Sequence, residues 1–255
     1  MVKIRFKPFA VALASCVMIV SVYYLAYSFS TGKTGQTLKS SPTAGCGAKT
    51  TGGGSCHGTS ANTAVTATIG GSHILGAGKT GAYTLSLSGS TGVGGGFDIA
   101  VGSGTLSASA DSIQLQSGEL THTRPLGTPY LIKFSLTAAG AGLDTIFANG
   151  KGVPGWNWAP NFIIRVGPPP APVLDSPPTN SVGLPLTPKL VWSGIVGPRW
   201  TVEAATDSTF ASPVLHQVVV GETTYTVKAG ILQNDVVYYW HVSATDTGGT
   251  SPYSL

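Results

Sequence analysis

The sequence predicts an all-β protein, built as two consecutive β-sandwiches after a signal sequence. From Val65 onward, short runs rich in Val, Ile, Leu and Tyr alternate with Gly-rich turns, which is the pattern of strands joined by turns. Hydrophobic residues make up 42% of the chain and charged residues 9%, so enough apolar surface exists to form packed cores. A chain of 255 residues has the length of two domains of ordinary size.

Residues 1–28 are predicted to be the signal sequence. Three basic residues form a positive n-region: Lys3, Arg5 and Lys7. The uncharged apolar run 9–25 follows, and Ala26-Tyr27-Ser28 then places small residues where a signal peptidase reads. We therefore expect cleavage before Phe29 and export to the cell surface or the extracellular space. The alternatives are an uncleaved membrane anchor and lipidation of Cys16, which ends a lipoprotein-like box.

The charge balance argues against nucleic-acid binding and against conventional catalysis. Removal of the three basic residues of the signal takes the formal net charge from +4 to +1, which leaves no basic footprint for a phosphate backbone. Acidic residues are sparse, and neither a carboxylate pair nor a Ser/His/Asp arrangement stands out in the sequence. We therefore do not expect an enzyme.

Residues 46–166 are predicted to form the first sandwich, after a polar and flexible lead-in at 29–45. Its expected strands are 65–69, 82–87, 97–101, 112–116, 130–136, 144–148 and 161–166. In Tyr83-Thr84-Leu85-Ser86-Leu87 the apolar residues fall at every second position, as a half-buried strand requires. The Gly-rich run 92–96 lies between two of these strands and is predicted to be a turn.

A Pro-rich linker is predicted at residues 167–172, because polyproline cannot donate backbone hydrogen bonds to a sheet. Residues 173–255 follow with longer strands and more aromatic residues. They include Leu190-Val191-Trp192 in an early strand, and a later strand over 238–244 in which alternate residues share one face. On these motifs the segment resembles a fibronectin type III module of bacterial surface proteins, which implies an immunoglobulin-like sandwich around a buried Trp192.

The same resemblance implies a tyrosine corner at Tyr238, because Leu232 lies six residues before it. Strand alternation directs His241 away from the core, so His241 and His216 are expected to be ordinary surface residues without a role. The final edge strand of such a module would only begin near Leu255. We therefore expect the module to be truncated at its C-terminus.

The stretch from Cys46 to Gly58 is where chemistry is expected. In an exported chain a cysteine pair normally forms a disulfide, here between Cys46 and Cys56. Covalently attached haem c is the alternative, because it needs two thiols and an imidazole directly after the second, and His57 occupies that position. Nine residues separate the cysteines instead of the usual two, and the Gly-rich insert would have to loop out. A zinc site lacks a full ligand set at normal spacing.

Five short motifs carry a second family resemblance. They are Gly32-Lys33-Thr34-Gly35, Cys56-His57-Gly58, Gly96-Phe97-Asp98-Ile99, Thr121-His122-Thr123 and Ile146-Phe147-Ala148-Asn149-Gly150. On these motifs the first domain resembles the Reeler-like, choice-of-anchor domains of secreted bacterial proteins, although the cysteine spacing departs from the family pattern. If haem is present, the resemblance implies His57 and His122 as its axial ligands, which suits electron transfer; His73 is a weaker candidate. Without haem, His122 is expected to be a polar residue at a sandwich turn.

Trp156 and Trp158 alternate through a Pro-bounded loop. Exposed, they would stack on a ligand such as a sugar ring; buried, they would cover the end of the sandwich.

The function predicted from the whole sequence is that of an exported structural or adhesive binding protein without a cofactor. Its ligand would be a surface or extracellular protein or polysaccharide, and the membrane would be reached only through an uncleaved signal or a further C-terminal anchor. The alternative is a monohaem c-type electron-transfer protein with haem attached through Cys46 and Cys56.

Overall fold

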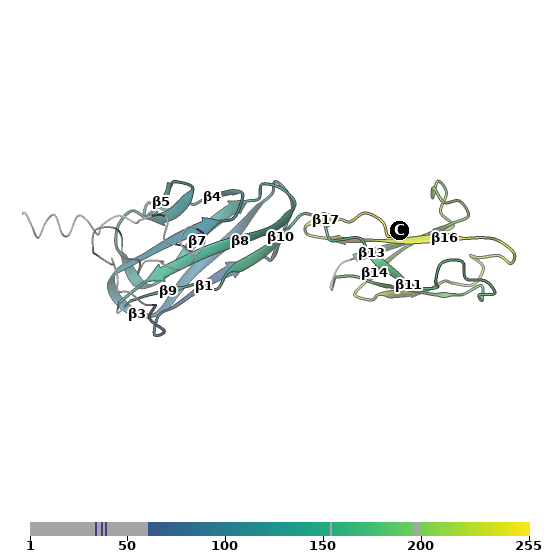
Figure 1. Cartoon of the computed structure of the whole chain (residues 1–255), viewed down its shortest axis with the longest axis horizontal. Coiled ribbons are helices and arrows are strands. Elements are labelled where there is room, and N and C mark those ends of the chain that lie inside the picture. The colour runs from purple at the N-terminus through teal and green to yellow at the C-terminus, as the bar shows by residue number, and fades with distance from the viewer. Residues whose placement is uncertain (1–33, 35–36, 38, 40–60, 154, 196–198) are drawn as a thin grey trace, which may run out of the picture. The chain divides into compact units, whose positions relative to one another are not determined.

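The computed structural model describes residues 34, 37, 39, 61–153, 155–195 and 199–255. Within these ranges every regular element is a β-strand, which confirms the all-β prediction (Figure 1). In the same ranges no helix is long and apolar enough to cross a membrane. The predicted signal sequence and Cys46, Cys56 and His57 lie outside the described residues, so the statements about them stay predictions.

Packing divides the described chain into two compact units. The first takes in residues 61–72, 81–137 and 144–163, and the second takes in 73–80, 138–143 and 164–255. The predicted domain boundaries, including the linker at 167–172, stay predictions.

Ten strands join in the first sheet system, in the order β2-β10-β8-β3-β6-β5 with β1, β4, β7 and β9 attached beside this path. Their bounds are β1 Thr66–Gly71, β2 Ile74–Leu75, β3 Thr80–Val101, β4 Thr105–Ser107, β5 Ile113–Gln116, β6 Glu119–His122, β7 Leu126–Thr137, β8 Gly142–Lys151, β9 Trp156–Trp158 and β10 Phe162–Val166. The long strand β3 belongs to two half-sheets. Its N-terminal part pairs with β1 and its C-terminal part pairs with β6 and β8. We call the β1–β3–β7–β4 part the first half-sheet and the rest the second half-sheet.

The Gly-rich run 92–96 continues β3 from one half-sheet into the other, so the predicted turn is wrong. Gly92 and Gly94 have φ angles of +112° and +114°, which glycine adopts without strain and which bend the strand. Side chains replace part of the ladder here. Three alternate carbonyls, those of Gly92, Gly94 and Gly96, accept hydrogen bonds from Thr128 Oγ1 at 3.1 Å, Lys151 Nζ at 2.6 Å and Tyr130 Oη at 2.5 Å, respectively.

We call the ten-stranded sheet system the first module and strands β11 to β17 the second module. In the core of the first module, buried residues recur at every second position, as predicted. Tyr83, Leu85 and Leu87 of β3 are buried, and the residues between them are partly exposed. Tyr83 stacks on Phe134 of β7, with ring centroids 5.9 Å apart. The alternation therefore places both aromatic rings inside the sandwich and leaves small polar residues on the outer face.

Seven strands build the second module as two facing sheets. The three-stranded sheet has the order β11-β12-β15, and the four-stranded sheet has the order β14-β13-β16-β17. Their bounds are β11 Val173–Ser176, β12 Lys189–Ser193, β13 Arg199–Ala205, β14 Leu215–Val220, β15 Thr224–Thr226, β16 Tyr239–Asp246 and β17 Gly249–Thr250. This confirms the second predicted sandwich.

Two tryptophans occupy the centre of the second core. Trp192 and Trp200 are buried and meet edge to face, with ring centroids 6.0 Å apart. Tyr238 Oη accepts a hydrogen bond from the Gln233 backbone N–H at 3.2 Å, which is the backbone contact expected of a tyrosine corner.

Hydrogen bonding along β16 continues beyond β17, and the predicted C-terminal truncation of the module stays a prediction. Ser251 and Ser254 each form two hydrogen bonds with one residue of β16, one through the backbone N–H and one through the side-chain hydroxyl. The Ser251 N–H donates to the Ala244 carbonyl and its Oγ accepts from the Ala244 N–H; Ser254 does the same with Val242, at 2.8–2.9 Å throughout. Serine hydroxyls thus take the place of backbone carbonyls along this edge, beside Pro252.

Candidate functional site

His122, the predicted haem ligand within the described residues, ends β6 and is half-buried beside Phe97. The Phe97 N–H donates to His122 Nδ1 at 3.2 Å. A Cβ at Gly96 would come within 2.5 Å of the His122 ring, so the ring packs directly on a glycine backbone. Burial lowers the pKa of His122, a backbone hydrogen bond with Phe97 raises it, and the Lys151 charge lowers it again. The net shift is downward, so His122 is neutral at pH 7.

The tautomer of His122 bears on the haem prediction. Nδ1 lies 3.2 Å from the Phe97 backbone N and 3.4 Å from the Phe97 carbonyl oxygen, so whether it accepts or donates depends on which ring nitrogen holds the proton. Iron ligation through Nε2 would need that proton on Nδ1, where the Phe97 carbonyl oxygen, 3.4 Å away, is the nearby acceptor. The surroundings of His122 accommodate either tautomer, and its role as an iron ligand stays a prediction. Within the described ranges, no three His, Cys, Asp or Glu residues group as metal ligands.

Trp156 does not offer a stacking surface to a ligand. It lies in β9 with 3% of its surface exposed, and it meets the half-buried Trp158 edge to face at 5.0 Å. The prediction that Trp156 stacks on a ligand does not fit its burial; the pairing of β9 with β8 places Trp156 opposite Lys151 and Trp158 opposite Asn149.

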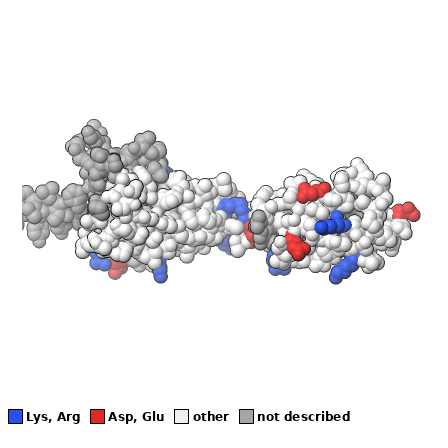
Figure 2. Space-filling view, turned by 90° about the horizontal axis from the view of Figure 1, so that it is seen from below, with Lys and Arg blue, Asp and Glu red and all other residues white. Residues whose placement is uncertain are grey.

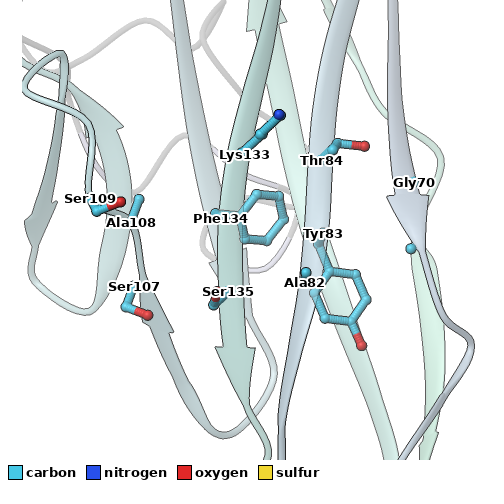
Figure 3. A pocket seen from close by; sticks show the side chains of 11 residues that line it. Gly70, Ala82, Tyr83, Thr84, Ser107, Ala108, Ser109, Lys133, Phe134 and Ser135 are labelled. Carbon is cyan, nitrogen blue, oxygen red and sulfur yellow. The ribbon is translucent and has the colours of Figure 1, made fainter.

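An open groove of about 650 Å³ lies on the outer face of the first half-sheet (Figure 3). It crosses β1, β3, β7 and β4. Small residues form most of its lining, namely Gly70, Gly71, Ala82, Thr84, Ser107, Ala108, Ser109 and Ser135, and the buried Tyr83 and Phe134 form its base. Lys133 is the one charged side chain among the lining residues.

The groove exists because its strands carry mostly small side chains on this face. Large residues of β3 and β7 point into the core, and at the groove the outward positions hold Ala82 and Thr84 of β3 and Lys133 and Ser135 of β7. The polar side-chain groups that line the groove are therefore hydroxyls and the ammonium group of Lys133. On the face shown in Figure 2, the charged side chains are few and scattered.

A second group, which we call the carboxylate cluster, lies on the outer face of the four-stranded sheet. Glu203 of β13 stands opposite His216 of β14 and His241 of β16 in the strand register. Its Oε1 lies 2.7 Å from His216 Nδ1 and its Oε2 lies 2.7 Å from His241 Nε2. Tyr253 also donates a hydrogen bond to Glu203. One carboxylate thus connects three strands and the C-terminal segment.

Aromatic rings enclose His241 on both sides. Its ring lies 3.5 Å from that of Phe210 and 3.7 Å from that of Tyr253, with interplanar angles of 10° and 14°. Phe210 has a φ of +54°, and its loop is held by Asp207 Oδ1, which accepts the Thr209 N–H at 3.0 Å. The loop after β13 and the last residues of the chain therefore cover the cluster.

The electrostatics keep Glu203 ionised. Burial raises the pKa of Glu203, but hydrogen bonds from His241, His216 and Tyr253 together lower it more, so the pKa lies below the usual glutamate value. Burial and the Glu203 carboxylate raise the pKa of Tyr253, which keeps its hydroxyl protonated at neutral pH. Three side chains share this carboxylate as hydrogen-bond partners.

The expectation that His216 and His241 have no role is corrected by this cluster. His241 does point away from the core, as predicted, but it is largely covered and bound on its outer side. One feature of the sequence could have indicated this cluster. Glu203, His216 and His241 occupy outward positions on three strands that are neighbours in the strand order of a fibronectin type III module. Alternation alone does not give the register that brings them together.

Comparisons with known proteins give little beyond this geometry. No protein-family model matches the sequence, and no curated protein matches it. The crystal structure of chicken CNTN1 FN1–FN3 domains is 15% identical, with 73% of this chain and 60% of that chain covered and a TM-score of 0.26. A two fibronectin type III domain segment from chicken tenascin is 13% identical, with 73% and 95% covered and a TM-score of 0.27. This chain spans 60% of the CNTN1 fragment.

Both TM-scores are too low to carry an argument, so the fold is assigned from the strands themselves. The Reeler-like resemblance of the first module stays a prediction. The second module has three strands facing four, a buried Trp192 and the Tyr238 corner contact. On these features, the second module has a fibronectin type III-like fold.

Proposed function

We propose that the chain is an exported structural or adhesive binding protein of the cell surface or the extracellular space, and not an enzyme. In this proposal the first module binds the ligand and the second module acts as a spacer or a further binding unit. The groove on the first half-sheet is the observation that carries the proposal.

The lining of the groove favours a polysaccharide over a protein as the ligand. Protein interfaces centre on exposed aromatic and aliphatic side chains. Here the aromatic residues Tyr83 and Phe134 are buried, the accessible apolar surface comes from small side chains and backbone, and the uncharged polar side chains of the lining are hydroxyls such as those of Thr84 and Ser135. Hydroxyl groups both donate and accept hydrogen bonds, which suits a hydroxyl-rich chain, and Lys133 adds a partner for a carboxylate on an acidic sugar.

The groove is tested by affinity electrophoresis through gels that contain polygalacturonate or neutral dextran. We expect retardation by polygalacturonate, and we expect Lys133→Ala to weaken it about tenfold because a charge-assisted hydrogen bond is lost. Ala82→Trp should abolish it by filling the groove, whereas Thr63→Trp, an exposed site away from the lining, should not. Equal retardation of the Ala82→Trp variant and the unaltered chain would place binding elsewhere.

The alternative function is monohaem electron transfer with Cys46 and Cys56 as attachment sites and His57 and His122 as ligands. Haem would supply a one-electron redox centre. Of this set the structure describes His122, which is half-buried beside Phe97 at the end of β6.

A further inference from the structure

Strand β14 is an outermost strand of the four-stranded sheet, and its outer edge pairs with no strand among the described residues. The direction of its backbone groups follows from the opposite side of the sheet. In β16, Val242 and Ala244 direct both their N–H and their C=O groups toward the last residues of the chain. Because these groups alternate from side to side along a strand, those of the intervening residues of β16 face β13.

The same alternation carries through β13 into β14. Glu203 pairs with His241, so its backbone groups face β16 and those of its neighbour Val202 face β14. Val202 pairs with Gln217, so the backbone groups of Gln217 face β13 and those of the residues on either side of it face away. The backbone groups at the free edge are therefore those of His216, Val218 and Val220.

The side chains of these three residues are exposed on the outer face of the sheet. Val220 is 67% exposed and Val218 is 36% exposed, and the His216 side chain is 61% exposed. At the edge itself, the Val218 carbonyl accepts a hydrogen bond from Gln217 Nε2 at 2.9 Å. An exposed amide side chain changes rotamer rapidly, so this contact does not exclude an incoming strand.

The other edges of the second module carry features that discourage strand pairing. Edge strands are commonly protected by proline, by charged residues or by being very short. Strand β11 lies between Pro172 and Pro177 and contains Asp175, β15 has three residues, and β17 has two residues and is followed by Pro252. Strand β14 has six residues, Leu-His-Gln-Val-Val-Val, without a proline and without an Asp, Glu, Lys or Arg. Its edge is therefore the one in this module that is suited to pairing.

We propose that β14 pairs antiparallel with β14 of a second copy of this chain, about a two-fold axis at Val218. The backbone groups of His216, Val218 and Val220 form the hydrogen bonds between the two copies. In this register Val218 lies opposite the partner's Val218, and Val220 lies opposite the partner's His216. The two four-stranded sheets then form one continuous sheet.

The edge is complementary to itself, which favours a second copy over an unrelated strand. At the two-fold axis the β-branched side chains of Val218 form a cross-strand pair. Within one chain Val220 pairs with Arg199, and His216 pairs with Glu203. Each outer row of the joined sheet therefore holds Arg199 of one copy and Glu203 of the other, so the charges in a row are opposite in sign and no like charges face one another.

The pairing does not depend on a ligand in the groove or on the fate of Cys46 and Cys56. Under the proposed function, a dimer carries two copies of the groove, which suits a polymer with repeated units.

Cysteine cross-linking between copies tests the register. Residues of a hydrogen-bonded antiparallel pair have Cα atoms about 5.5 Å apart, a separation that a disulfide spans. In the full chain, Val218→Cys should therefore form a disulfide between the two copies of this position under mild oxidation, identified as a cross-linked peptide by mass spectrometry without reduction. Val220→Cys is the matched control. Val220 is more exposed but lies opposite the partner's His216, so this variant should cross-link to itself at least tenfold more slowly.

Sedimentation equilibrium of the full chain measures the association itself. We expect a dimer that dissociates on dilution, with a Kd of about 1–100 µM. Val218→Lys should raise the Kd at least tenfold, because it places two ammonium groups opposite each other at the two-fold axis. Val173→Lys makes the same change at an exposed valine of β11 on the other sheet, and it should leave the Kd unchanged.

Two results would overturn the proposal. One is cross-linking of Val220→Cys as fast as that of Val218→Cys, which would indicate random collision. The other is a chain that stays monomeric at about 200 µM, or a dimer that Val218→Lys does not weaken. The calorimetric transition of the second module shows whether each variant is folded. If Val218→Lys unfolds the module, the two cysteine variants decide.

Discussion

Replacing Trp200 with Ala is expected to lower the free energy of unfolding of the second module by about 3–5 kcal/mol. Trp200 is 2% exposed and packs edge to face on Trp192. A Cβ at Gly194 would lie 2.6 Å from the Trp200 ring, so the Gly194 backbone packs directly against the indole. Removing the ring opens a cavity at the contact between the two sheets, which the neighbouring strands can fill only in part.

Differential scanning calorimetry measures this loss as a fall of at least about 10 °C in the transition of the second module. Tyr239→Ala is the matched control, because Tyr239 lies on the same sheet but is exposed. The control should change the midpoint by no more than a few degrees. A Trp200→Ala variant that melts with the unaltered chain would mean that this core is not packed as described.

Replacing Glu203 with Gln is expected to cost the second module about 2 kcal/mol at pH 7. The carboxylate accepts from His216, His241 and Tyr253 at once. A glutamine amide presents one oxygen and one donor group, so it cannot accept from both histidines. The loss weakens the connection between β13, β14, β16 and the last residues of the chain.

The cost of Glu203→Gln should depend on pH in a stated direction. The pKa of Glu203 is lower in the folded protein than in the unfolded chain, so its stabilising contribution is present above the unfolded pKa and disappears as the pH falls through the folded pKa. The difference between the two chains should therefore shrink from pH 7 to pH 3. Urea unfolding at both pH values checks this, with Glu222→Gln at an exposed site as the control. A difference that stays constant with pH would contradict the assigned role of the carboxylate.

Much of the fold could be predicted from periodicity and breakers. The alternation over 83–87 identified a half-buried strand, and Trp192 with Tyr238 identified the sandwich of the second module. The run 92–96 was misread because glycine serves both turns and bent strands, and the hydrogen bonds that keep it in β3 come from residues distant in sequence, such as Lys151. Short strands such as β9 are too brief to show a period.

The site was less predictable than the fold. The groove is made of small residues from four strands, and small outward residues carry no signal until the strand order is known. The carboxylate cluster needs the register of β13 against its two neighbours, which a one-residue slip would reverse.

Export is the claim on which the proposed function rests, because it fixes both the location of the protein and the chemistry of Cys46 and Cys56. The most direct test is the intact mass of the chain recovered outside the cytoplasm. The predicted result is a chain that begins at Phe29, lighter by two hydrogen atoms than its reduced form and carrying no haem. A chain found only in the cytoplasm, with Met1 and all three cysteine thiols reduced, would contradict export. A mass increased by one haem would contradict the disulfide and establish the electron-transfer alternative.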